Sequence, residues 1–273
     1  MTSKIVRYVI LIAMGILWLL PIYLLLANAS KLTSEYSGSN LWAPGNFPAL
    51  VSNIVDVFTT TDVPSGLFIT VIYAVIAPFI AVILGAAVGY AVIALKLKHG
   101  FFWFFVIFCG TVFPLQLMVI PLFAAYSQVG LFDTAVGMIL IYSVVCLPFS
   151  AFVMRNFFAG IAESVFEAAV VDGAKPWRIF TQIYLPMSRS ALVVVFILQA
   201  TWVWNDFLLA LILTQSSEIR PVMPMLQALQ SVQGGGSAFT VLLTAALLVS
   251  IPTALLFGLS QKYFQRGLAL GQY

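Results

Sequence analysis

Charged side chains are scarce in this 273-residue chain. Only 8% of its residues are charged, 62% are apolar, and the mean hydropathy is +1.09. A soluble domain carries roughly 25% charged residues, so this chain cannot cover itself with a water-facing surface. The net charge of +3 comes from scattered residues, whereas a nucleic-acid-binding protein needs basic residues clustered on one face. The composition therefore indicates a membrane protein with no nucleic-acid partner.

Residues that support redox, metal or covalent chemistry are also few. Both cysteines, Cys109 and Cys146, lie inside apolar runs, which leaves no disulfide framework and no Cys-x-x-Cys site. The single histidine, His99, has no Cys, Asp or Glu at ligand spacing. The sequence contains neither a Gly-x-x-x-x-Gly-Lys-[Ser/Thr] phosphate loop nor a Gly-x-Ser-x-Gly nucleophile elbow. We therefore expect no catalytic residue, no metal and no cofactor bound by this chain.

Long apolar runs occupy most of the sequence. A helix needs about 20 mainly apolar residues to cross the hydrocarbon core. The runs that qualify lie at 5–27, 67–94, 101–125, 132–154, 190–213 and 239–261. They predict an all-α integral membrane protein, a six-span helical bundle in a single domain over 1–273. The first run also resembles a signal peptide, but it exceeds the roughly 7–15 apolar residues of that class, so we expect an uncleaved span.

The positive charges predict the orientation of this bundle. Lys and Arg are retained in cytoplasmic loops, and they favour both termini inside. The segments that are then cytoplasmic contain Lys4, Arg7, Lys96, Lys98, Arg155, Lys175, Arg178, Arg189, Lys262 and Arg266, and the outer ones contain Lys31 and Arg220. The long connections are the outer loops 28–66 and 214–238 and the inner loop 155–189, where we expect the functional contacts.

The inner loop predicts a helix–turn–helix. Apolar residues recur at helical spacing over 162–171, and Gly173 is placed to end that helix in a left-handed conformation. Pro176 suits the first turn of a second helix, which Pro186 would end. The composition alone is equally compatible with a helix pair that lies on the lipid headgroups.

The residues of this loop resemble the EAA loop of binding-protein-dependent ABC importer permeases. The match is Glu167-Ala168-Ala169-Val-Val-Asp172-Gly173-Ala174, followed by Ile183-Tyr-Leu185-Pro186. The Asp-Gly-Ala form is most similar to the carbohydrate branch, and within it to the smaller, six-span permease of the maltose-transporter type. Weaker resemblances are Pro114-x-Gln116, Trp204-Asn205-Asp206-Phe207 and Arg266-Gly267-Leu268.

The resemblance implies a type I ABC importer permease fold in the prokaryotic cytoplasmic (inner) membrane. The implied partners are a second permease subunit, two ATP-binding subunits that hold ATP and Mg, an extracytoplasmic solute-binding protein and a carbohydrate substrate. The permease itself would catalyse no reaction and would alternate between inward- and outward-facing states. The residues implied to dock on an ATPase are Glu167, Ala168, Ala169, Asp172, Gly173 and Ala174.

A few polar side chains within the spans are candidates for the substrate pathway. They are Gln116, Gln199, Asn205 and Asp206. Asp206 is the one acidic residue within a predicted span, and charges at that depth often serve function. Each of the four residues could instead bond to neighbouring helices and hold the bundle together. Trp202 and Trp204 could stack on sugar faces or anchor the chain at an interface.

The outer loop 214–238 contains Gly234, Gly235 and Gly236. Glycine allows backbone conformations that other residues avoid. By resemblance, this loop is a candidate for contact with the binding protein, and the simpler interpretation is a flexible connection.

Other functions remain open at this point. The importer could carry a non-sugar solute such as glycerol phosphate or a polyamine. A secondary transporter or channel would need membrane-embedded charges, for which only Asp206 is available, and would leave the inner loop unexplained. A purely structural assembly subunit is the third alternative.

Overall fold

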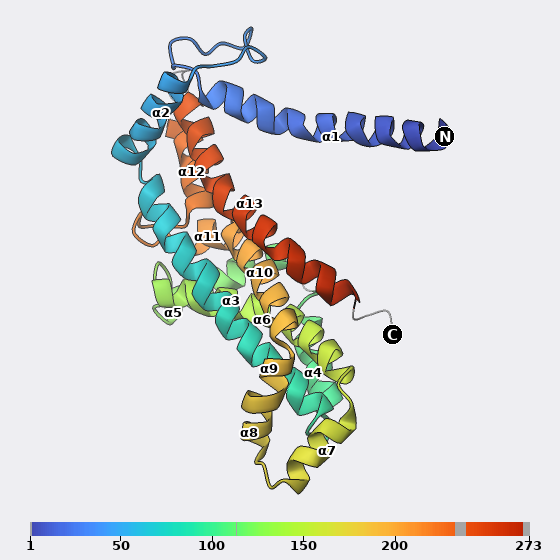
Figure 1. Cartoon of the computed structure of the whole chain (residues 1–273). Helices are drawn as coiled ribbons and strands as arrows, with labels where there is room; N and C mark the ends of the chain where they lie inside the picture. Colours follow the sequence, from blue (N-terminus) through green and yellow to red (C-terminus); the bar gives the residue numbers. More distant parts are fainter. Residues whose placement is uncertain (1, 113, 233–238, 270–273) are drawn as a thin grey trace. The chain divides into compact units, whose positions relative to one another are not determined.

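The computed structural model describes residues 2–112, 114–232 and 239–269, and within these residues the regular structure is entirely helical (Figure 1). The all-α prediction is therefore confirmed. The helices are α1 (Thr2–Ala29), α2 (Phe47–Thr60), α3 (Val63–Ile93), α4 (Gly100–Cys109), α5 (Leu115–Gln128), α6 (Ala135–Ala159), α7 (Glu163–Val171), α8 (Pro176–Ile179), the π-helix η1 (Phe180–Tyr184), α9 (Leu185–Met187), α10 (Arg189–Trp204), α11 (Leu208–Leu213), α12 (Val222–Val232) and α13 (Phe239–Ala269).

The chain forms two compact units. Unit 1 comprises Met1–Leu67 and Pro224–Pro252, and unit 2 comprises Phe68–Met223 and Thr253–Tyr273. Unit 2 contains the inner loop and all four candidate pathway residues.

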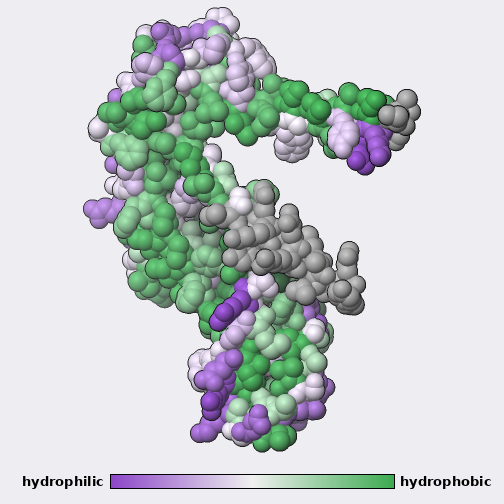
Figure 2. All heavy atoms as spheres, in the orientation of Figure 1, coloured by the Kyte–Doolittle hydropathy of each residue, from purple (hydrophilic) through white to green (hydrophobic). Residues whose placement is uncertain are grey.

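Four predicted spans are single apolar helices long enough to cross a membrane. They are α1, α3, α6 and α13, with mean hydropathies of 2.7, 2.8, 2.2 and 2.2. The apolar window of α1 has none of its residues buried, and Figure 2 shows its side chains as a largely apolar surface. Lipid or a partner subunit must cover such a surface, because exposed apolar area on this scale is unfavourable in water.

The other two predicted spans, 101–125 and 190–213, are each built from two helices with a break between them. Residues 110–114 separate α4 from α5, and residues 205–207 separate α10 from α11. Pro114, with φ −65° and ψ 117°, has extended backbone directly before the first residue of α5. The number of membrane crossings and the single-domain bounds remain predictions.

Helices α3 and α6 approach each other closely within unit 2. A Cβ atom on Gly85 would lie 2.7 Å from the backbone nitrogen of Ala151, and one on Gly89 would lie 2.7 Å from that of Arg155. Real Cβ atoms do not approach backbone at that distance, so both positions require glycine. The Gly-x-x-x-Gly face of this span therefore packs one helix on another, as is common in membranes.

In unit 1, a buried polar network folds the outer loop onto α1 and α2. The ammonium of Lys31, only 3% exposed, donates hydrogen bonds to Asn28 Oδ1 (2.8 Å) and to the carbonyl of Asn40 (2.5 Å). Asn53 on α2 donates to the carbonyls of Ala29 and Lys31, each at 2.8 Å. These bonds satisfy buried polar groups and give the loop a defined structure.

Candidate functional site

The inner loop forms a helical hairpin, which we call the inner hairpin and define as residues 163–187. Its first helix, α7, ends at a tight turn in which Gly173 has φ +76°. The backbone N–H of Gly173 donates to the Val170 carbonyl (2.9 Å) and that of Ala174 to the Ala169 carbonyl (3.0 Å). Glycine is favoured there because it adopts positive φ without a steric penalty. The predicted helix–turn–helix is confirmed.

The second arm of the hairpin differs from the prediction. It begins at Pro176 as expected, but the four-residue α8 passes into the π-helix η1. Pro186 then lies inside α9 and does not end the arm, which continues to Met187. The arm and α10 are bent by 77° at Ser188. Wider π-helical turns of this kind often occur at functional sites.

The residues of the EAA-like segment fall into two groups by exposure. Ala169 is 6% exposed, and Ala174 is partly buried against the core of unit 2. The outward group is exposed and consists of Glu167, Ala168, Asp172 and Gly173. One helix face therefore attaches the hairpin to the bundle, and the other carries the acidic side chains.

The attached face belongs to a buried apolar cluster at this end of unit 2. The hairpin contributes Ala169, Ile179, Phe180 and Tyr184, which pack with residues of α3, α6 and α10. Burial of large apolar side chains of this kind stabilises a structure by about 1.5–3 kcal/mol each. The hairpin is therefore packed on the helices it connects and does not hang from them as a free loop.

Tyr90, near the end of α3, is the centre of this cluster. Its hydroxyl donates to the carbonyl of Pro176 at 2.9 Å, which ties α3 to the first residue of α8. Its ring lies 4.9 Å from that of Tyr184, 5.1 Å from that of Phe180 and 6.4 Å from that of Phe166, centroid to centroid. Tyr90 was not predicted from the sequence, where its one signal is a tyrosine near the end of an apolar run.

An ion pair adds a second attachment. The ammonium of Lys96, in the turn between α3 and α4, pairs with the carboxylate of Glu163 at the start of α7. The hydrogen bond and the charge of Glu163 raise the pKa of Lys96. Both side chains are largely exposed, so the pair contributes little to stability and mainly restricts the start of α7.

The tip of the inner hairpin presents apolar side chains beside the acidic ones. Val171 is 87% exposed, Trp177 72% and Val170 51%. Charged and apolar groups therefore alternate over the outer surface of α7 and α8, at the lower end of unit 2 in Figure 2. Exposed tryptophan surrounded by polar groups is a common centre of protein–protein interfaces.

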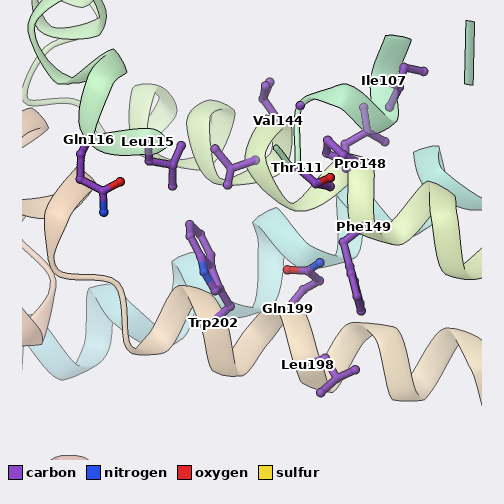
Figure 3. Close-up of a pocket in the computed structure, with 13 residues that line it drawn as sticks. Ile107, Thr111, Leu115, Gln116, Val144, Pro148, Phe149, Leu198, Gln199 and Trp202 are labelled. Carbon is purple, nitrogen blue, oxygen red and sulfur yellow. The ribbon is translucent and has the colours of Figure 1, made fainter. Parts of the chain in front are cut away.

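A cavity lies farther along unit 2, between α10 on one side and α4, α5 and α6 on the other (Figure 3). Its volume is about 740 Å³, and its walls are mostly apolar. Gln116 and Gln199 both line it, and in Figure 3 Trp202 extends from α10 toward the wall that carries Leu115. The Gln199 amide donates to the Cys146 carbonyl at 3.3 Å. The structure thus brings together two of the four predicted pathway residues.

The remaining two, Asn205 and Asp206, line a neighbouring hollow of about 540 Å³. The two spaces share Leu198 and Trp202. The Asn205 amide donates to the Thr201 carbonyl at 2.7 Å, within its own helix region. These two residues therefore border the second space and do not line the first.

Asp206 bonds to neighbouring elements of unit 2. One carboxylate oxygen, Oδ2, accepts hydrogen bonds from the Tyr142 hydroxyl on α6 (2.9 Å) and from the backbone N–H of Ala210 on α11 (3.0 Å). Both partners belong to the protein, which agrees with the interpretation that Asp206 holds helices together. Tyr142 did not emerge from the sequence, because a buried tyrosine in an apolar helix gives no periodic signal.

The first residues of the outer loop 214–238 are held by Asp133, which lies in the same unit. Its Oδ1 accepts hydrogen bonds from the backbone N–H groups of Gln215 (2.7 Å) and Ser216 (3.0 Å). Burial alone would raise the pKa of Asp133, but these hydrogen bonds and the charge of Arg220 lower it. The predicted contact residues Gly234, Gly235 and Gly236 lie outside the described residues.

Comparison with known proteins gives consistent matches over most of the chain. The family model "Binding-protein-dependent transport system inner membrane component" matches residues 81–270. A probable ABC transporter permease protein of Pyrococcus horikoshii is 34% identical over 277 residues, which cover 97% of each chain. The diacetylchitobiose uptake system permease protein of Streptomyces coelicolor is 27% identical, and the matched region covers 98% of this chain and 88% of the relative.

The fold is also that of a solved structure. It is that of a bacterial ABC transporter involved in the import of the acidic polysaccharide alginate. The match has a TM-score of 0.78 at 23% identity and covers 96% of this chain and 98% of the other. At this identity the likeness establishes the architecture and leaves the solute open.

Proposed function

Because the chain belongs to the family of inner membrane components of binding-protein-dependent transport systems, we propose that it is the permease subunit that carries a carbohydrate, an oligosaccharide in particular, across that membrane. The chain is an ABC importer permease with the type I fold, and a translocation subunit by family. A second permease, ATP-binding subunits and a solute-binding protein are the general partners of such a permease.

The observation that carries the mechanism is the division of the inner hairpin into an attached face and an exposed face. The exposed face, with Glu167 and Asp172 beside Val171 and Trp177, has the charge and apolar area that a cleft of an ATP-binding subunit would grip. The attached face packs around Tyr90. A displacement of the hairpin would therefore move α3, α6 and α10. The bundle would then open to the other side of the membrane. ATP and Mg would be held and ATP hydrolysed by the partner subunits.

The lining of the cavity is suited to binding a neutral, hydroxyl-rich solute. Sugars present flat C–H faces that stack on aromatic rings and hydroxyls that bond to amides, and Trp202, Gln116 and Gln199 supply both kinds of group. The lining residues are uncharged, whereas glycerol phosphate or a polyamine would require an opposite charge to offset its desolvation. The Streptomyces relative is named as part of a diacetylchitobiose uptake system, which supports a saccharide as the solute.

The test combines charge reversal at the hairpin with solute uptake. We expect Glu167→Lys to reduce co-purification of the ATP-binding subunit and saccharide uptake by about tenfold or more, the effect of losing one strong interface contact, with normal amounts of the chain in the membrane. Lys98→Glu, a charge reversal outside the inner hairpin, is the matched control. Equal recovery of the ATP-binding subunit by both variants would contradict the docking role.

Uptake into proteoliposomes then separates the alternative solutes and classes. The assembled transporter should import labelled diacetylchitobiose or another neutral oligosaccharide, and neither glycerol phosphate nor spermidine. This chain reconstituted without its partners should support no gradient-driven flux. Flux by the isolated chain would favour a secondary transporter.

A further inference from the structure

We propose that Tyr142 is a positioning residue for the sugar cavity: its buried side chain holds the indole of Trp202 in place, and Asp206 acts on the cavity through Tyr142. The inference rests on the proposed function for the identity of the ligand. It assigns a role to a residue that does not line the cavity itself.

Tyr142 is enclosed by aromatic and polar partners from three other elements. It is 0% exposed. Its ring centroid lies 6.2 Å from that of Trp202 on α10 at an interplanar angle of 85°, and 6.0 Å from that of Tyr73 on α3. An edge-to-face pair of this kind is favourable by about 0.5–1.5 kcal/mol beyond the area it buries. The ring of Tyr142 therefore packs against the indole of Trp202.

The hydroxyl group determines where this ring sits. It donates to Asp206 Oδ2 at 2.9 Å. That oxygen is itself held at the start of α11, because it also accepts the backbone N–H of Ala210 at 3.0 Å. A fixed carboxylate fixes the hydroxyl, and the hydroxyl fixes the ring against which Trp202 packs.

Tyr73 is the second aromatic neighbour of Tyr142. It is 0% exposed, and its hydroxyl donates to the carbonyl of Ile219 in the outer loop at 3.0 Å. The row Trp202, Tyr142 and Tyr73 thus extends from the cavity to a hydrogen-bonded loop. Each ring in this row has a defined neighbour.

Trp202 is the residue through which this arrangement reaches a ligand. It lines both the larger cavity and the neighbouring hollow, and Figure 3 shows its indole extending into the space opposite Leu115 and Gln116. Binding sites require supporting residues that hold a contacting group within about 0.5 Å. If the indole becomes mobile, the stacking surface offered to a sugar is lost.

The first experiment uses the complete transporter with Tyr142→Phe, which keeps the ring and removes the hydroxyl. Tyr126→Phe is the matched control, because Tyr126 is also buried and its hydroxyl also donates one hydrogen bond, in its case to the backbone carbonyl of Gly137 at 3.1 Å. Tyr126 does not line the cavity. Acrylamide quenching of Trp202 is obtained as the difference between each protein and its Trp202→Phe counterpart.

We expect Tyr142→Phe to increase the quenching of Trp202 without added sugar. It should also lower the uptake of diacetylchitobiose, cellobiose or maltotriose, whichever the native transporter carries, by about fivefold or more, as for the loss of one buried hydrogen bond. Tyr126→Phe should change neither quantity. Co-purification of the ATP-binding subunit serves as the assembly check for every variant.

A double-mutant cycle tests whether Asp206 acts through Tyr142. If it does, Asp206→Asn combined with Tyr142→Phe lowers uptake no further than the more severe single variant. Fold-changes that multiply would overturn the inference, as would unchanged quenching in Tyr142→Phe. A native transporter that carries no saccharide but still shows the quenching change would refute the proposed function and leave the positioning role supported for another solute.

Discussion

At the scale of single residues, two glycines are required for different physical reasons. Gly85 has no room for a side chain, because an added Cβ would lie 2.7 Å from α6. Gly173 has nothing within 4 Å of such an atom, but its φ of +76° is a conformation that side chains disfavour. The first glycine permits two helices to pack, and the second permits the inner hairpin to turn.

The turn at Gly173 gives a prediction that separates backbone strain from crowding. A non-glycine residue in the left-handed region costs about 1–2 kcal/mol, so Gly173→Ala should distort the turn, and Gly173→Val should do so more strongly. We expect Gly173→Ala to lower ATP-binding subunit recovery and uptake several-fold, roughly the factor of 5–30 that this energy represents, with membrane insertion intact.

Gly160→Ala provides the control for this prediction. Gly160 also ends a helix, but with φ −85°, which any residue adopts. Recovery of the ATP-binding subunit per permease, measured after affinity purification, should therefore remain normal in Gly160→Ala. If the two alanine variants behaved alike, the conformational requirement at Gly173 would be disproved.

At the scale of secondary-structure elements, α11 is held at both ends by residues in or next to α6. Asp206, bonded to Tyr142, accepts the N–H of Ala210 near its start. Beyond its end, Asp133 accepts the N–H groups of Gln215 and Ser216, and its own N–H donates to the Leu213 carbonyl at 2.9 Å.

Loss of the Asp133 carboxylate should loosen the outer loop. We expect Asp133→Asn to accelerate amide hydrogen exchange over residues 214–220 by about fivefold at pH 7, since hydrogen bonds to a charged acceptor are replaced by weaker ones. Exchange is measured by mass spectrometry on the detergent-solubilised transporter. Glu218→Gln, a change at an exposed acidic residue of the same loop, is the control and should leave exchange unaltered.

The pH dependence of this effect follows from the lowered pKa of Asp133. Because the folded pKa lies below its usual value of 3.8, the stabilisation is fully present above that usual value and is lost as the pH falls through the folded pKa. The exchange rates of the native protein and Asp133→Asn should therefore converge as the pH falls through this lowered pKa. A ratio that stayed constant with pH would show that the carboxylate charge does not hold the loop.

At the scale of the whole molecule, the distribution of positive charge and of apolar surface defines the surroundings of the chain. At most 44% of the apolar window is buried in any of the four long spans. Their remaining surface needs lipid or a second permease subunit. Water must reach the segments that carry Lys and Arg, and these segments include the inner hairpin.

This charge asymmetry predicts the sidedness of the chain. Reporter fusions after Lys175 should be active only as cytoplasmic reporters, and fusions after Glu218 only as extracytoplasmic ones, because positive residues resist translocation. Alkaline phosphatase and green fluorescent protein fused at the same two positions provide reciprocal measurements. Phosphatase activity after Lys175 would place the inner hairpin outside and refute its contact with an ATP-binding subunit.

Local sequence signals predicted the inner hairpin well and the shape of its second arm poorly. The Gly173 turn and the Pro176 start depend on short-range backbone preferences, which a sequence displays directly. The π-helical turn over Phe180–Tyr184 depends on packing of Phe180 and Tyr184 around Tyr90, about 90 residues away in the chain. The local periodicity of a sequence contains no information about such a long-range contact.

The sequence by itself determined that the chain lies in a membrane, that it is helical and where the hairpin turns, and it predicted the orientation. These properties follow from hydropathy, charge placement and backbone preference, each of which is local. Only the tertiary structure decided which polar residues share a space. It placed Gln116 with Gln199 in one cavity and joined Asp206 to Tyr142, since side chains that are distant in sequence meet only after the helices have broken and packed.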